Sequence, residues 1–600
     1  MKPTIEYLKD SFKIDYEAFE SSRREASQVW DLYHNRHYTA EQLAILAQRG
    51  QPAETFNVVK MFARMLVGYY STVVNTVVVQ PANPRDITTA SVLNDTINYV
   101  FDDNRFDIEG DEIKLGGLVS GLLCSYTNVE KTGEGDQFNR PLYRTNVHSV
   151  PDNEIILDAN STKDDYSDAV RLHRFKWLSK DQVIKAFGNE SVEKLDAYHN
   201  FLNEEDTEFE YNYGESFTGY FKVYDNFLIV HTVTEDTDGR RWSTFWSDEV
   251  KLQESEITYQ DTKWPYRVQK LQSSDKTEYY GIFREVIEPQ KALNQAVLQI
   301  QLMVNSEKVM VESDAVENID DFATAYNRVN AVIPVVNLQG VRLDKLSREI
   351  AEQYTIIDNA LNRIQRVLGI NDSFLGMAFA SDSGRKVKLQ QNQTVMSLRY
   401  ITARIEAFYR SLGEDIGNLV KQYYTATQIL AITDDYTGQR WVELNKPIME
   451  GNEPVLIPET DPATGDLAKD DFGNIIMAPV SEEDSDLAFT EFQIKIVSSS
   501  YNDEDEKSQL LLETVMSGSV GTMMSKVNPA GFFQMAGLSM KSMSTKHSPE
   551  IAKILEQTAA MLQQSPEAQQ GASEMAAGGT GQQPLSKSLK LPQNTNEGVA

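Results

Sequence analysis

Two long helices of nearly equal length, separated by some forty residues, constrain the fold of this chain most. The first is expected at about residues 282–305, where apolar residues recur at helical spacing: Leu293, Val297, Ile300 and Val304. The second is expected at residues 346–368, where one face is apolar throughout: Leu346, Ile350, Tyr354, Ile357, Leu361, Ile364 and Leu368. Each would be roughly 35 Å long at 1.5 Å per residue. Because residues 306–345 are too many for a turn, the pattern predicts an antiparallel helical hairpin carrying a small α/β module at its far end.

The charge balance disfavours a protein that grips nucleic acid through an excess of basic residues. The 600 residues contain 57 Lys and Arg against 89 Asp and Glu, a formal net charge of −32. A protein that holds nucleic acid by neutralising its phosphates needs the opposite excess. Hydrophobic residues make up 41% of the chain, enough for packed cores, and the length predicts three or four folding units.

The single cysteine and the absence of targeting signals limit the chemistry further. Cys124 has no second cysteine to pair with and lies in an apolar stretch, which favours a buried and inert thiol. The first twenty residues lack the order of a signal peptide, so the chain is expected to begin in the cytoplasm. The most apolar runs, 66–79 and 115–126, are shorter than the ~20 residues of a membrane helix, so no membrane association is expected.

The regions before and after the hairpin have different patterns. Residues 1–280 predict one mixed α/β region, with helices at 16–46, 58–73 and 107–124, strands at 142–147 and 153–158, and a hairpin turning at the Asp-Gly pair 238–239. After the hairpin come a Gly- and Ser-rich loop and a third helix that reaches about Tyr424. Residues 441–500 hold 13 acids against 3 Lys, which predicts an acidic β-rich insert. Helices are expected at 503–516 and 549–563, and disorder from residue 568.

Recognised catalytic motifs are missing. There is no phosphate-binding Gly-Lys-Ser/Thr loop, no HExxH and no nucleophile elbow, so neither an enzyme nor a cofactor is expected. His34 and His37 have a spacing that allows a shared metal, but no obvious third ligand is near. A metal-dependent nuclease or hydrolase that uses carboxylate pairs, such as Asp102 with Asp103 or Asp320 with Asp321, stays as the alternative.

A local break in the acidic background lies beside the Gly- and Ser-rich loop. Arg385, Lys386 and Lys388 lie at the start of the third helix. A helix N-terminus is electrostatically unfavourable for cations. The two interpretations that remain open are contact with phosphate and simple exposure to solvent.

Residues 279–303 read YYGIFREVIEPQKALNQAVLQIQLM and include Tyr280, Gly281, Arg284, Gln290 and Asn294. This segment resembles the start of the stem helix of phage portal proteins, particularly those of short-tailed phages, and other segments resemble the same family in the same order. Residues 23–43 with Trp30 and Tyr38, and 55–69 with Asn57, Arg64 and Gly68, resemble its opening. So do residues 149–179 around Asp158, Asp168 and Trp177. The segment SDSGRKVKLQQNQ resembles the tunnel loop and following helix, although Lys386 stands where the family often has a small residue.

The resemblance implies an α+β, predominantly helical subunit of a twelve-membered ring at one capsid vertex, through which DNA is packaged and ejected. Its implied divisions are wing (1–280 and 389–500), first stem helix (281–305), clip (306–345), second stem helix (346–368), tunnel loop (369–388), crown (501–565) and disordered tail (566–600). Twelve copies would carry 12 × −32 = −384 formal charges, so an acidic lumen would repel phosphates over about 8 Å at physiological salt.

The resemblance also implies partners and sites. Arg385, Lys386 and Lys388 would contact the DNA in the channel. A separate terminase and later the tail adaptors would dock near the acids of the clip: Glu312, Asp314, Glu317, Asp320 and Asp321. Further implied partners are the major capsid and scaffolding proteins, and the implied location is the virion after assembly in the host cytoplasm. An oligomeric tail or scaffold component outside the portal family is a second alternative.

Overall fold

The computed structural model describes most of the chain: residues 2–49, 51–73, 76–135, 140–201, 226–305, 347–371, 384–434 and 438–450, with residues 222, 223 and 374 and shorter pieces within 308–344, 453–497 and 532–558. The chain forms two compact units, Met1–Val497 and Ser498–Ala600. In the second unit, Phe532 and Ala536 are buried against Phe533 and Leu555. The predicted segments 503–516 and 566–600 lie outside the described residues, as does almost all of 549–563.

Helices and sheets alternate through the first unit, which is therefore α+β as predicted. The described helices are α1 (Ile5–Ala18), α2 (Glu20–Tyr33), α3 (Ala40–Gln48), α4 (Val58–Val73), α5 (Ile87–Asp103), α6 (Phe106–Ser120), α7 (Lys180–Phe187), α8 (Asn189–Phe201), α9 (Ile287–Asn305), α11 (Ser347–Leu368) and α12 (Gly384–Tyr423). Short 3₁₀ turns are η1 (Pro84–Asp86), η2 (Asp152–Glu154) and η4 (Arg284–Val286).

Every strand pairing in the described part of the chain is antiparallel. The largest sheet has the order β4-β5-β7-β8-β9, with β6 beside β7: β4 (Ile155–Leu157), β5 (Arg171–Ser179), β6 (Lys222–Val223), β7 (Asn226–Glu235), β8 (Arg241–Ser247) and β9 (Val250–Glu256). A second sheet has the order β10-β2-β3: β2 (Leu122–Gly135), β3 (Pro141–Ser149) and β10 (Tyr266–Lys270).

The remaining strands form two-stranded sheets: β1 (Thr76–Pro81) with β19 (Phe492–Val497), β11 (Lys308–Val311) with β12 (Val341–Asp344), β13 (Gln428–Asp434) with β14 (Gly438–Leu444), β15 (Met449–Glu450) with β16 (Glu453–Pro454), and β17 (Leu456–Pro458) with β18 (Met477–Pro479). The predicted acidic insert is thus a set of short strands. The pairing of β1 with β19 joins the end of that insert to the N-terminal region.

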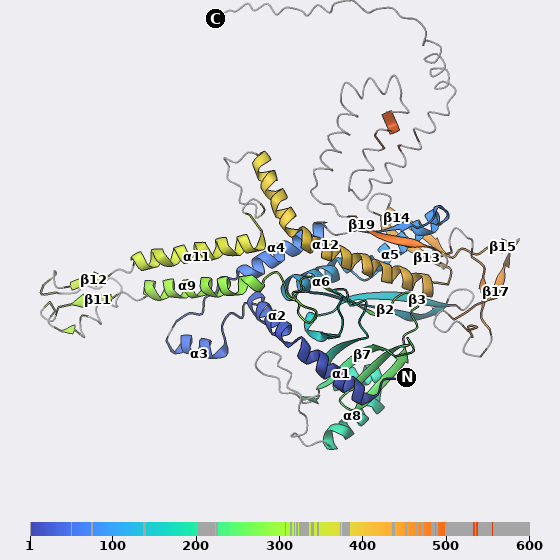
Figure 1. Cartoon of the computed structure of the whole chain (residues 1–600), viewed down its shortest axis with the longest axis horizontal. Coiled ribbons are helices and arrows are strands. Elements are labelled where there is room, and N and C mark those ends of the chain that lie inside the picture. The colour runs from blue at the N-terminus through green and yellow to red at the C-terminus, as the bar shows by residue number, and fades with distance from the viewer. Residues whose placement is uncertain are drawn as a thin grey trace, which may run out of the picture. The chain divides into compact units, whose positions relative to one another are not determined.

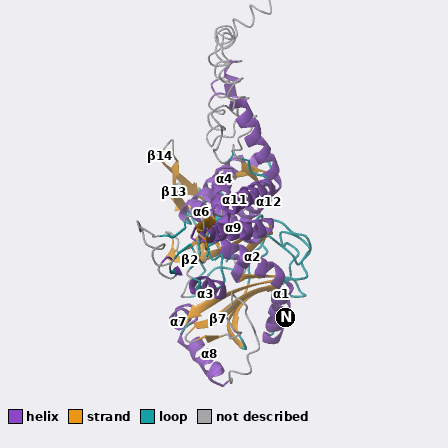
Figure 2. Ribbon diagram, turned by 90° about the vertical axis from the view of Figure 1, so that its left-hand side faces the viewer, coloured by secondary structure: helices purple, strands orange, loops and turns teal. Residues whose placement is uncertain are grey.

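Strand β7 of the six-stranded sheet is buried on both faces. Its consecutive side chains point to opposite sides of the sheet, and each side is covered by helices. Leu228 and Val230 of β7 pack with Phe12 of α1, which lies along the sheet in Figure 2. Phe227 and Ile229 pack in a separate cluster with residues of α7 and α8. A strand covered in this way is a nearly continuous apolar run, as in NFLIVHTV.

The predicted pair of long helices is present, but the first one begins at Ile287 rather than at about 282, because residues 284–286 form the 3₁₀ turn η4. Helices α9 and α11 lie side by side in Figure 1, and the β11–β12 pair lies at their far end. The exposure of the apolar stripe on α11 is lowest near the end of the helix: Ile364 and Leu368 are buried, whereas Tyr354 is 56% exposed. In the far half of the stripe, Ile350 and Ile357 are half-buried, so Tyr354 is the one described member that lies mostly in solvent.

Helix α12 forms the centre of the largest core. Its predicted stripe is buried from Leu398 to Leu419. Gly413 and Gly417, one turn apart, let α12 lie directly on β1 and β19, because a Cβ at either position would overlap side chains of those strands. The helix begins at Gly384, so the loop before it ends a few residues earlier than the predicted 388.

The predicted helix at 107–124 is confirmed as far as Ser120 and wrong in its last four residues. Helix α6 stops at Ser120, Gly121 adopts φ +97°, and β2 starts at Leu122. Residues 122–126 pair with β10 instead. The apolar run through this region carries no periodicity that separates helix from strand, and the left-handed glycine ends the helix.

Candidate functional site: the root of the helical hairpin

The residues that resemble the start of a stem helix meet at one place, where η4 and α9 leave the wing-like region. We call this cluster the hairpin root: Tyr280, Gly281, Arg284, Gln290 and Asn294. Gln290 and Asn294 are buried, one turn apart on α9. The others lie just before α9, in the segment that crosses the end of α6.

Two glycines allow this crossing. The amide of Ile282 donates to the carbonyl of Leu118 at 3.0 Å, and Leu271 donates to the carbonyl of Gly121 at 2.8 Å. A Cβ on Gly281 would overlap the backbone of Leu118 and Val119, and one on Gly121 would overlap the backbone of Tyr280. Only glycine permits this approach of two backbones.

Arg284 links the root to α2. Its Nε donates to Glu25 and its Nη2 to Glu278, each at 2.6 Å. The guanidinium also lies 3.8 Å from the centre of the Tyr280 ring. Hydrogen bonds from Ser274 and Arg284 lower the pKa of Glu278. The planar fork of arginine matches two carboxylates and one ring at once, which a lysine would not.

Gln290 links α9 to the start of α4. Its Oε1 accepts from the amide of Val58 at 3.0 Å and that of Val59 at 3.4 Å. Its Nε2 donates to the carbonyl of Phe56 at 2.7 Å and to Oδ1 of Asn294 at 3.1 Å. Helix N-termini leave such amides without intrahelical partners. Gln290 therefore acts as a cap for α4 from more than 230 residues away.

Asn294 extends the same network to the segment after α2. Its Oδ1 accepts from the amide of Phe56 at 3.2 Å, and its Nδ2 lies 2.7 Å from Nδ1 of His37. With Nδ1 as the acceptor, the proton of a neutral ring is on Nε2. Burial lowers the pKa of His37, which keeps the ring neutral and suited to this bond. The root is thus a polar junction that fixes α9 to α2 and α4.

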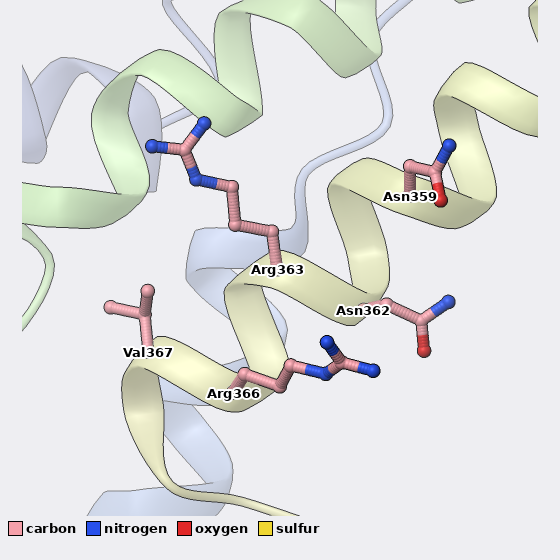
Figure 3. Close-up of a pocket in the computed structure, with 5 residues that line it drawn as sticks. All are labelled: Asn359, Asn362, Arg363, Arg366 and Val367. Atoms are coloured by element: carbon pink, nitrogen blue, oxygen red, sulfur yellow. The ribbon is translucent and has the colours of Figure 1, made fainter.

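The face of α11 near the root bears a hollow of about 380 Å³. Figure 3 shows the five side chains that line it: Asn359, Asn362, Arg363, Arg366 and Val367. Among the described residues, no carboxylate forms an ion pair with Arg363 or Arg366. Figure 3 shows the guanidinium of Arg366 on the same side as the amide of Asn362, and that of Arg363 directed to the other side, so each cation would meet an anion separately.

The other predicted site residues are only partly described. Arg385, Lys386 and Lys388 belong to the first turns of α12, and their side chains lie outside the described residues. Glu312 is exposed next to β11, and its carbonyl accepts from the amide of Ala315 at 2.9 Å. Asp314, Glu317, Asp320 and Asp321 lie outside the described residues. The structure therefore brings together the root residues and leaves the other two predicted sets untested.

Other candidate groups have structural partners. His37 contacts Asn294, and the ring of His34 stacks on Trp30. Cys124 is buried in β2, and burial raises the pKa of its thiol. Within the described residues, no three His, Cys, Asp or Glu side chains gather closely enough to hold a metal ion. In the same part of the chain, every helix is too short or too polar to cross a membrane.

Some well-connected residues were not singled out from the sequence. Asp15 of α1 accepts from Arg171 at 2.6 Å and lies 3.3 Å from His173, and both partners belong to β5. Asp152 is buried and accepts from the indole of Trp30 at 3.1 Å, and burial raises its pKa to about 6. The only sequence signal for either carboxylate is an acid within an apolar pattern, which occurs too often to be diagnostic.

Comparison with known proteins agrees with the resemblance. The model of the phage P22-like portal protein family matches residues 9–593. A portal protein of Helicobacter pylori bacteriophage KHP30 is 21% identical over 448 residues, which cover 73% of this chain and 70% of that protein. A match over nearly the whole length includes the hairpin, its root and α12. The chain therefore belongs to the P22-like family of phage portal proteins.

Proposed function

We propose that twelve copies of this chain form a ring at one capsid vertex, and that the channel of the ring carries DNA during packaging and ejection. The observation that carries this proposal is the hairpin of α9 and α11, which is fixed at its root and exposes apolar side chains farther along both helices. Tyr354 of α11 and Leu302 of α9 are 56% and 47% exposed. Two helices alone leave such apolar side chains in water, and neighbouring copies of the same hairpin would cover them.

Within this ring, α9 and α11 would be the stem, β11 and β12 part of the clip, and the α/β regions the wing. Arg363 and Arg366 at the hollow of Figure 3, with Arg385, Lys386 and Lys388 at the start of α12, are the candidates for contact with phosphates. A few cations centre or briefly hold a duplex without the strong affinity that many phosphate contacts would give.

The clip would be the docking surface for the packaging ATPase and later for tail proteins. Glu312 is exposed beside β11, and the other acids of this set lie within ten residues of it: Asp314, Glu317, Asp320 and Asp321. An acidic surface of this kind favours partners with a basic face.

Mass measurement and imaging of the purified protein test the ring. Twelve copies of a 67.9 kDa chain have a mass of about 815 kDa. We expect particles of that mass with a central bore wide enough for a duplex. Closed particles without a bore, or open filaments as the only assembly, would contradict the proposal.

The phosphate contacts are tested by the triple substitution Arg385→Gln, Lys386→Gln and Lys388→Gln. We expect rings of unchanged mass but a changed amount of DNA packaged or retained in particles. The matched control is Lys291→Gln, which removes an exposed cation of α9 that is paired with Glu288 at 2.8 Å. Normal genome content in the triple variant would refute the assignment of these three cations.

A further inference from the structure

Helix α3 is an apolar helix without cover. Its sequence is AEQLAILAQ, and none of its nine residues is buried. Leu43 and Ile45 are each 45% exposed, and in Figure 1 α3 stands apart from the other helices. An isolated helix of this length is marginal in water, so packing against a further surface would stabilise it.

The sequence nevertheless specifies α3 as a helix and fixes both its ends. Thr39 and Gln42 form a capping box at its start. Before α3, His37 contacts Asn294 of the hairpin root, and after it the amide of Phe56 donates to the same Asn294. The hydroxyl of Tyr38 donates to the carbonyl of Glu54 at 2.9 Å and closes the base of this segment. The residues on both sides of α3 are therefore fixed to the hairpin root, while α3 itself projects from it.

A hollow elsewhere on the same chain has a size and a lining that suit a short apolar helix. It measures about 370 Å³, lies between α4 and α6, and is lined by Tyr33, Arg64, Val67, Asp107, Ile108, Asp111, Glu112 and Leu115. Ile108 at this hollow is 56% exposed. Because no residue of α3 is buried, α3 does not fill the hollow of its own chain.

The charges around the two surfaces are complementary. Arg49 follows the last turn of α3 and is exposed, and Asp107 is exposed at the hollow. Within the described residues, neither has an ion-pair partner. Glu41 in the first turn of α3 and Arg64 at the hollow form a second pair of opposite sign. An apolar helix with Glu41 at one end and Arg49 at the other thus meets a hollow whose lining combines apolar side chains with one cation and three acids, an excess of acid that suits Arg49.

We propose that α3 of one copy docks into the hollow between α4 and α6 of the next copy. A projecting surface and a receiving surface at different places on one chain make a head-to-tail contact, and such contacts close into rings when the rotation permits. This inference rests on the proposed ring and names a contact that builds it. Because the segment that carries α3 is hydrogen-bonded to Asn294 of α9, this contact would depend on the position of that helix.

Cysteine cross-linking tests the contact in the full-length protein. Because Cys124 is buried, introduced cysteines are the reactive ones. The variant carrying Ile45→Cys and Ile108→Cys should give, after mild oxidation, a ladder of covalent multimers under denaturing, non-reducing conditions. Each single variant should stay monomeric there, and so should Ile14→Cys with Ile108→Cys, since Ile14 lies on α1 and is exposed in the same way.

The outcomes separate this contact from the ring itself. Rings of the expected mass without a ladder, or a disulfide within one chain, would overturn the docking of α3 and leave the ring intact. Absence of any ring would overturn both. As a second measurement, Arg49→Asp or Asp107→Arg alone should weaken association about fivefold at each interface, and the two together should restore it. Failure of that restoration, with no ladder, would rule the contact out.

Discussion

Replacing Gln290 with Ala should release the first turn of α4. The substitution removes four hydrogen bonds. Three of them measure between 2.7 and 3.1 Å and join Gln290 to the amide of Val58, the carbonyl of Phe56 and Oδ1 of Asn294. The fourth, from the amide of Val59, is longer at 3.4 Å and adds little. Buried neutral hydrogen bonds contribute about 1 kcal/mol each, so the loss is about 3 kcal/mol, with a further cost for the cavity. A free energy of about 3 kcal/mol corresponds to roughly a 150-fold increase in the equilibrium constant for local opening of the first turn of α4.

Hydrogen exchange measured by mass spectrometry is the suitable assay, because a chain of several units does not unfold in one step. We expect peptides that cover residues 54–62 to exchange about a hundredfold faster in the Gln290→Ala variant. Lys291→Ala is the matched control, since its side chain is exposed and its ion pair with Glu288 contributes little. Unchanged protection at 54–62 in the Gln290 variant would refute the reasoning that this side chain caps α4.

Further predictions concern the root, a buried acid and the clip. Gly281→Ala should destabilise the protein by about 3 kcal/mol because its Cβ would meet backbone atoms, whereas Gly68→Ala has open space and should be neutral or stabilising by thermal melting. Because burial raises the pKa of Asp152 to about 6, the folded state holds this proton more tightly than the unfolded chain, and its favourable contribution is lost as the pH rises from about 4 through 6. Asp152→Asn should therefore raise the melting temperature more at pH 7.5 than at pH 5, and an equal effect at both would contradict the assigned pKa. Charge reversal by Glu312→Lys should weaken packaging stimulated by the terminase in a defined packaging assay; unchanged stimulation would count against docking at the clip.

The sequence predicted those elements in which periodicity and turn residues agree. Helix α4 begins at Val58 and ends at Val73, as its apolar spacing indicates. The β7–β8 hairpin turns at Gly239, which has φ +78°. Between α6 and β2 the sequence is apolar on every side, so no period separates helix from strand, and only the conformation of Gly121 ends the helix.

The site was predictable in part, for a physical reason. The root residues were identified through a resemblance, but their function depends on partners far along the chain, such as Val58 for Gln290 and Glu25 for Arg284. Neither the residue type nor the local spacing encodes such a partner. The exposure of Leu43 and Ile45 was equally hidden, because the sequence of α3 looks like that of a buried helix.

The acidic residues are distributed unevenly along the chain, and their distribution determines which part of a channel would repel DNA. Helix α11 carries three arginines and three acids, and α9 carries one lysine and one glutamate. The excess of acid therefore lies outside these two helices, for example in residues 441–500, and α12 itself has more bases than acids. If α9 and α11 form the stem, its wall is close to neutral, and repulsion of phosphates comes from other parts of the ring. A wall of balanced charge gives little net attraction or repulsion beyond the few contacts proposed for Arg363 and Arg366, so at the stem the passage of DNA should depend only weakly on salt.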